Sequence, residues 1–252
     1  MKKLHFRLTP KRFAIVSAIA LLALGALIPA TAFAASNQPQ AKCAATDTKC
    51  VITLGDTLIS NRLTSLNTLN GKISTDLSNH KITSDQASAL HSDVSTNQTG
   101  LNNLKTKLDA ETVAKNARQD AASIFTQFRI YAVVLPRDYR RLEMDIEINA
   151  KGVMQGVAPT IKKAISSAPA GKQAKLNSLY DDYQKQVAAA ESQLDIAQHD
   201  FPAMTPENFN QNRSSYESTR LALDTALKNA RVDLHQAAKD LKQMANILGI
   251  KE

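Results

Sequence analysis

Residues 176–201 read LNSLYDDYQKQVAAAESQLDIAQHDF, and their apolar positions recur at alternating intervals of four and three residues. At this spacing, side chains line one side of an α-helix and meet those of a partner helix. The stretch therefore predicts a long helix in a coiled-coil-like pair. Its predicted seam consists of Leu176, Tyr180, Tyr183, Val187, Ala190, Leu194, Ala197 and Phe201.

The partner helix follows directly. Pro202 ends the first helix, Thr205 is a suitable N-cap, and Pro206 and Glu207 suit the first helical turn. Gly249 then favours an end near the C-terminus. The second seam comprises Phe209, Tyr216, Leu223, Leu227, Ala230, Leu234, Ala237, Leu241, Met244 and Leu248. An antiparallel alignment predicts three pairs: Phe201 with Phe209, Leu194 with Tyr216, and Val187 with Leu223.

A similar hairpin is predicted over residues 51–136. Thr83 and Gln86 form a capping box for its second helix. Asn70 and Asn97 interrupt the two seams; they either bond to each other and fix the register or each face water. The seam positions are Ile59, Leu63, Leu66, Asn70, Ile73 and Leu77, then Ala87, Leu90, Val94, Asn97, Leu101, Leu104 and Leu108.

The segment between the hairpins predicts further helix. An apolar run from Phe125 to Leu135 is expected to pack the hairpins together, and Pro136 is expected to end its helix. Residues 137–252 then predict a helix kinked at Pro159 followed by the second hairpin. The predicted fold is all-α, with long antiparallel helical hairpins packed as an elongated bundle.

Residues 1–34 have the composition of a signal peptide. Five basic residues precede an apolar stretch from Phe13 to Ile28, and Ala32-Phe33-Ala34 predicts cleavage after Ala34. The alternative is an uncleaved anchor, because residues 13–35 are long enough to span a bilayer. We therefore expect a secreted or cell-envelope protein, with membrane contact only through the signal segment if it is uncleaved.

The charge of the mature chain is nearly balanced. The predicted signal peptide contains five of the 31 basic residues and none of the 23 acidic ones, so 26 basic residues remain against 23 acidic residues. No basic stripe is interleaved with aromatic residues, a pattern that nucleic-acid binding favours. We therefore do not expect a nucleic-acid partner.

Cys43 and Cys50 are the only cysteines and lie in or at the end of a predicted tether, residues 35–50. In an exported chain, two cysteines most simply form one disulfide, here closing a short loop. Pairing between two molecules and free thiols are the alternatives.

The sequence contains no familiar catalytic or nucleotide-binding motif, so we expect neither an enzyme nor a cofactor. Asp195 and His199 are four residues apart on one helical face and are the best metal candidates. No further ligands are evident, and a metal site usually needs three or four. We therefore predict no metal site.

Arg137, Arg140 and Arg141 surround Tyr139 and are candidates for a partner surface. They could dock an anionic partner or pair within the chain with Glu143, Asp145 and Glu147. An intramolecular ion-pair network is the simpler interpretation.

Two resemblances add to these patterns. The segments Ile82-Thr83-Ser84-Asp85-Gln86 and Met204-Thr205-Pro206-Glu207-Asn208 resemble the Leu-Thr-x-x-Gln motif of the Spy/CpxP-type periplasmic chaperones, with departures at the first position of both and the last of one. This resemblance implies an envelope stress chaperone. The segment from Phe128 to Pro136, with Asp145 beyond it, resembles uncharacterised secreted bacterial coiled-coil proteins. That resemblance implies helical hairpins and no known activity.

The leading functional hypothesis is a secreted or cell-envelope helical scaffold without enzymatic activity, acting on a protein or cell-wall partner. The alternative is an envelope stress chaperone. The same apolar seams are compatible with a homo-oligomer.

Overall fold

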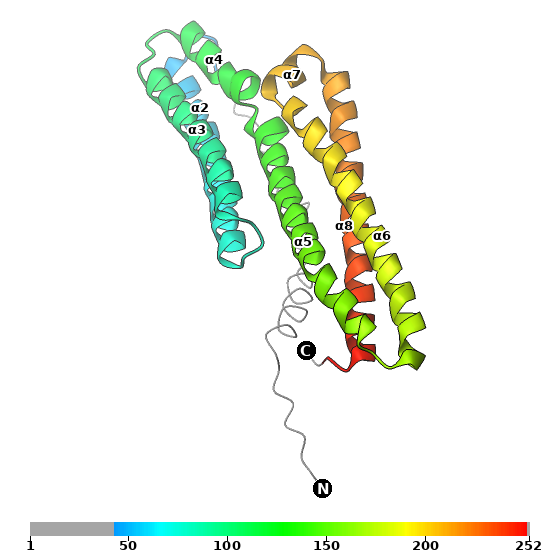
Figure 1. The fold of residues 1–252 in the computed structure, drawn as a ribbon. Helices are drawn as coiled ribbons and strands as arrows, with labels where there is room; N and C mark the ends of the chain where they lie inside the picture. Colours follow the sequence, from blue (N-terminus) through cyan, green and yellow to red (C-terminus); the bar gives the residue numbers. More distant parts are fainter. Residues whose placement is uncertain (1–42, 251–252) are drawn as a thin grey trace. The chain divides into compact units, whose positions relative to one another are not determined.

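The computed structural model describes residues 43–250, and among these residues the regular structure is entirely helical (Figure 1). The all-α prediction is confirmed. The predicted signal peptide, residues 1–34, and most of the predicted tether lie outside the described residues. Within residues 43–250, no helix is both long and apolar enough to cross a bilayer.

Over residues 43–250 the chain forms six long or medium helices joined by short irregular or tightly wound segments. In chain order the helical elements, with the connecting turns included, are α2 (Thr48–Ser78), α3 (Ser84–Asp109), α4 (Ala114–Ser123), the π-helical turns η2 (Ile124–Phe128) and η3 (Ile130–Val134), α5 (Leu135–Ser166), α6 (Ala170–Asp200), the 3-10 turn η4 (Phe201–Ala203), the short α7 (Pro206–Gln211) and α8 (Arg213–Leu248).

These elements group into two compact units. The described part of unit 1 is residues 146–198 and 224–250, and that of unit 2 is residues 43–145 and 199–223. Helices α5, α6 and α8 each contribute to both units. The grouping differs from the sequence division at residue 136, because the turn region of the second predicted hairpin belongs to the same unit as the first hairpin.

In unit 2, α2 and α3 pack side by side as an antiparallel hairpin (Figure 1). The turn between them contains His80 with a left-handed φ of 56°. Thr83 Oγ1 accepts a hydrogen bond from the Gln86 N–H at 3.2 Å, and Gln86 Oε1 accepts one from the Thr83 N–H at 2.8 Å. The predicted capping box is confirmed, and it sets where α3 begins.

The buried face of α2 is wider than the predicted seam. Ile59, Leu66 and Ile73 are buried as predicted, but Leu63, Asn70 and Leu77 are only half-buried. The intervening positions one residue earlier are buried instead: Arg62, Leu69 and Asp76. Helix α2 packs against both α3 and α4, so it buries side chains over a broader arc than one partner would require.

The two seam asparagines do not bond to each other. The Asn70 carboxamide oxygen is hydrogen-bonded to His91 Nδ1, and Asn97 Nδ2 donates to the Asp93 carbonyl at 2.8 Å. His91 of α3 therefore takes the position across from Asn70 that the sequence assigned to a second asparagine.

A close approach of α3 to α2 depends on Gly55. A Cβ atom at Gly55 would lie 2.3 Å from Leu108 Cδ2, well inside van der Waals contact, and 3.8 Å from the Ala121 Cβ of α4. Leu108 is fully buried. Leu108 thus occupies the space that a side chain at position 55 would need.

The helix break predicted at Pro136 lies earlier, at Arg129. This residue has a left-handed φ of 44° and separates η2 from η3. Pro136 is the second residue of α5, which follows η3 directly, so the helical run continues through the proline instead of ending at it. The apolar run is partly buried here: Ile130 is fully buried, whereas Phe125 remains 41% exposed. Segment η2 contacts α2, α3, α4 and α7, all in unit 2.

Unit 1 is built from the later part of α5, most of α6 and the later part of α8. Its core contains Met154, Val157, Ile161, Leu176, Tyr183, Val187, Leu234, Leu241 and Met244. The buried Tyr183 hydroxyl donates to the Met154 carbonyl at 2.6 Å, which links α6 to α5. Pro159 lies inside α5, and Gly249, with φ of 71°, follows the end of α8 as predicted.

Candidate functional site

The two cysteines form a disulfide at the beginning of α2. The Cys43 and Cys50 sulfurs are 2.00 Å apart, and the Cα atoms are 5.6 Å apart. Helix α2 begins at Thr48, so Cys50 lies in its first turn rather than in the predicted tether. The Asp47 carboxylate caps this turn by accepting from the Cys50 N–H at 2.9 Å. Arg118 of α4 donates to the Cys43 and Ala44 carbonyls at 3.1 and 2.5 Å.

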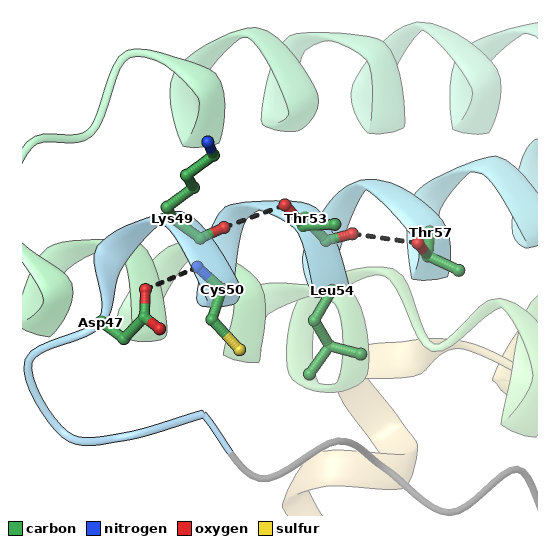
Figure 2. Close-up of a pocket in the computed structure, with 6 residues that line it drawn as sticks. All are labelled: Asp47, Lys49, Cys50, Thr53, Leu54 and Thr57. Carbon is green, nitrogen blue, oxygen red and sulfur yellow. Dashed lines mark hydrogen bonds between the residues drawn. The ribbon is translucent and has the colours of Figure 1, made fainter.

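A concavity of about 460 Å³ lies beside this disulfide (Figure 2). Its polar side chains serve the helix itself. Thr53 Oγ1 donates to the Lys49 carbonyl at 3.0 Å and Thr57 Oγ1 to the Thr53 carbonyl at 2.9 Å, as the dashed lines of Figure 2 show. These hydroxyls stabilise backbone carbonyls and are not gathered around a common point, so the concavity does not supply a catalytic constellation. Its lining residues are Asp47, Lys49, Cys50, Thr53, Leu54 and Thr57.

The weak metal candidates lie on the surface. Asp195 and His199 are exposed, and His199 Nδ1 is 3.0 Å from an oxygen of Asp200. Over the described part of the chain, no group of three or more His, Cys, Asp or Glu side chains is arranged to hold a metal ion.

The best-defined polar cluster lies where α3 meets the beginning of α5, within unit 2. Arg137 Nε and Nη2 both lie 2.7 Å from Asp138 Oδ1, and Arg137 Nη2 is 3.6 Å from Asp93 Oδ2. Arg141 Nη1 is 3.3 Å from the same Asp93 oxygen, and Arg141 Nε is 3.9 Å from Asp145 Oδ2. We call these five residues the α3–α5 charge cluster.

Two neighbouring contacts extend the α3–α5 charge cluster. Gln86 Nε2 donates to the Asp145 side chain at 3.4 Å, so the capping residue of α3 also reaches α5. The Arg141 guanidinium lies 5.7 Å from the centre of the Phe201 ring, in the range of a cation–π contact. The cluster therefore connects α3, α5 and η4 through side chains that are mostly withdrawn from water.

Burial changes the proton affinity of the acids on α5. Desolvation raises the pKa of Asp138 to about 6, although Arg137 opposes this rise. Desolvation likewise raises the pKa of Asp145 to about 6, against the effect of Arg141. Glu147, in unit 1, has its pKa raised to about 7 by desolvation, with Arg231 Nε 3.3 Å from its carboxylate.

The residues predicted for a partner surface lie in or beside this cluster. Tyr139 is only 8% exposed, so its side chain is not available to a partner. Arg137 and Arg141 pair within the chain, and Arg140 Nη1 donates to the Pro136 carbonyl at 2.9 Å. The arginines therefore belong to an intramolecular network in the structure, not to an open anion-binding face.

Sequence reasoning missed a buried cation on α2. Arg62 of α2 is 5% exposed and lies between two aromatic rings, 5.0 Å from the centre of Phe125 and 4.8 Å from that of Tyr131. Its Nη1 donates to the Leu58 carbonyl, and desolvation lowers its pKa. A signal was present: Arg62 is three residues after Ile59 and four before Leu66, which is seam spacing.

Comparison with known proteins adds no relative from which chemistry could be inferred: no family model, curated protein or solved structure matches this chain.

Proposed function

We propose that this protein is a secreted or cell-envelope helical scaffold that acts through its outer helical faces on a protein or cell-wall partner, without catalysing a reaction. The observation that carries the proposal is a stretch on each of α2 and α3 whose exposed side chains carry no charge. From residue 57 to residue 71 the only ionisable side chain is the buried Arg62. Residues 94–104 of α3 contain no ionisable side chain.

The exposed side of α2 is covered by hydroxyl and amide groups. We call it the neutral face and define it by Thr57, Ser60, Asn61, Thr64 and Thr68. Its threonines adopt a repeated arrangement, in which Thr64 and Thr68 donate to the carbonyls four residues earlier at 3.0 and 3.1 Å. Such a surface offers hydrogen bonds and methyl groups without charge repulsion, which suits a scaffold whose partner is itself neutral and polar.

Export is supported by the disulfide. Disulfides persist in oxidising compartments, and the Cys43–Cys50 bridge fits an extracytoplasmic location. We expect protein recovered from the cell envelope or medium to begin at Ala35 and to react with alkylating reagents only after reduction. An intact N-terminus with freely alkylated cysteines would contradict the export proposal.

The scaffold proposal is tested by crosslinking the tagged protein in cells and identifying captured partners. Thr64→Lys combined with Thr68→Lys places two charges on the neutral face. The control Ser192→Lys places one charge at an exposed position of α6. We expect a partner that is retained by the control and lost from the double variant. Equal capture by all three proteins would contradict the role of the neutral face.

A second candidate function is an envelope stress chaperone. The observation behind it is a set of exposed apolar side chains in unit 2, which includes Val113 at 52%, Phe125 at 41% and Leu221 at 56% exposure. Both Thr-containing motifs act as N-caps in the structure, so capping accounts for them. Suppression of client aggregation at stoichiometric amounts, reduced by Phe125→Ser with Leu221→Ser, would support this candidate, and absence of suppression by the wild type would remove it.

A further inference from the structure

One guanidinium is shared by two carboxylates at the junction of α3 and α5. Arg137 lies 2.7 Å from Asp138 on its own helix and 3.6 Å from Asp93 on α3. Asp93 also pairs with Arg141 at 3.3 Å, so this single carboxylate receives both arginine links from α5. Asp138 therefore competes with Asp93 for Arg137, and of these two contacts of Arg137 the one with Asp93 joins α5 to α3.

The two competing carboxylates have different surroundings. Asp138 is fully buried, and its Oδ2 atom has no hydrogen-bond partner. The Asp93 side chain is 38% exposed and can keep water around it. A buried carboxylate with an unsatisfied oxygen carries a large penalty for its charge, so burial favours proton uptake by Asp138.

We propose that proton uptake by Asp138 tightens the α3–α5 junction, because it weakens the Arg137–Asp138 ion pair and leaves Asp93 as the carboxylate partner of Arg137. The proton comes from solvent and no covalent bond other than the O–H bond changes. The junction is thus a conformational device that holds α3 more firmly in mild acid than at neutral pH.

The other charged and titratable groups around Asp138 are consistent with a junction that tightens when Asp138 takes up a proton. Arg141 of α5 lowers its proton affinity, while Asp93 of α3 raises it. On the α8 side, Tyr216 lies within electrostatic range of Arg137 and Arg140, and its buried hydroxyl carries no charge to compete for them. Burial also raises the pKa of Asp145, whose carboxylate faces Arg141 and Gln86.

The sign of the effect follows from linkage. The pKa of Asp138 is raised to about 6 in the folded protein, so its contribution to stability is present in full below the unfolded value and lost as the pH rises through about 6. Because carboxylates in water remain ionised above about pH 4, the two states are compared at about pH 5 and about pH 7.5.

The test is amide hydrogen exchange across Ser84–Asp109, corrected for the intrinsic effect of pH. In the wild-type protein we expect exchange near Asp93 to be at least about threefold slower at the lower pH. Asp138→Asn is nearly isosteric and permanently neutral, so it should give the slow exchange at both pH values. Asp93→Asn should abolish the difference, whereas Asp181→Asn, which removes an exposed acid on α6, should preserve it.

A pH response that survives unchanged in Asp138→Asn or in Asp93→Asn would overturn the proposal. A direct measurement covers the case in which a variant folds poorly. The carboxyl carbon of Asp138 in the folded wild-type protein should titrate with a midpoint near 6, and a chemical shift that stays constant between the two pH values would equally refute it.

Discussion

Gly55→Ala sets two opposing effects against each other, and the structure indicates which is larger. Alanine in place of a helical glycine stabilises a helix by about 1 kcal/mol. At Gly55 the added Cβ would lie 2.3 Å from Leu108 Cδ2. Leu108 is fully buried, so it can move only by disturbing its neighbours, and overpacking of this kind costs about 1–3 kcal/mol. We expect a net loss of about 1 kcal/mol.

Gly71→Ala is the matched control, because Gly71 is exposed on the same helix and nothing lies within 4 Å of its added Cβ. This variant should gain about 1 kcal/mol, so the two alanine variants should differ by about 2 kcal/mol. Urea unfolding with the disulfide intact measures both, provided that the slope is unchanged. In a Leu108→Ala background the cost at Gly55 should disappear. If Gly55→Ala were as stabilising as Gly71→Ala, the close packing of α2 on α3 would be refuted.

Three further predictions concern α8, the core of unit 1 and pH. Leu223→Asp should lower the free energy of unfolding by at least about 3 kcal/mol, because Leu223 is fully buried. The control Leu221→Asp, at a 56% exposed position, should have little effect on the urea midpoint. Equal urea midpoints for the two variants would mean that the seam of α8 is wrongly assigned. Tyr183→Phe should cost about 1 kcal/mol, because it removes the buried hydrogen bond to the Met154 carbonyl, and thermal unfolding that matches the wild type would contradict this role. The pKa of Glu147 is raised to about 7, so its contribution to stability is complete below about pH 4.5 and is lost as the pH rises through 7. Glu147→Gln should therefore be more stable than the wild type by about 1–3 kcal/mol at pH 8 and equal to it near pH 4.5. A constant difference in stability between these pH values would disprove the assignment.

The helix ends were predictable because the signals are local. Thr83 with Gln86, Thr205 before Pro206, and Gly249 each set a helix boundary through contacts within a few residues. The break at Arg129 was not predictable, because a left-handed arginine has no sequence signature comparable to that of glycine or proline. The proline seven residues later was the stronger signal, and yet the helical run continues through it from η3 into α5.

Only part of the α3–α5 charge cluster could be predicted from the sequence. Arg137 and Arg141 were expected to pair with acids, but the proposed acids lay on the same helix. Asp93, the carboxylate that both arginines share, is 48 residues from Arg141, and no pattern in one sequence reports such a long-range pair. Asp138 was overlooked although it precedes the buried Leu142 by four residues, an interval typical of one helical face. A charged residue at an inward position is thus worth treating as a buried ion, not as an error in the pattern.

The bridge between Cys43 and Cys50 spans a separation of only seven residues, and of the residues that it encloses only Thr48 and Lys49 belong to α2. A crosslink of this size can close once Cys50 has been synthesised, without waiting for α3 or α8. It also removes little freedom from the unfolded chain, because loop-closure entropy grows with loop length. Reduction should therefore fray the beginning of α2 and release the contact with Arg118 while the remainder of both units keeps its fold.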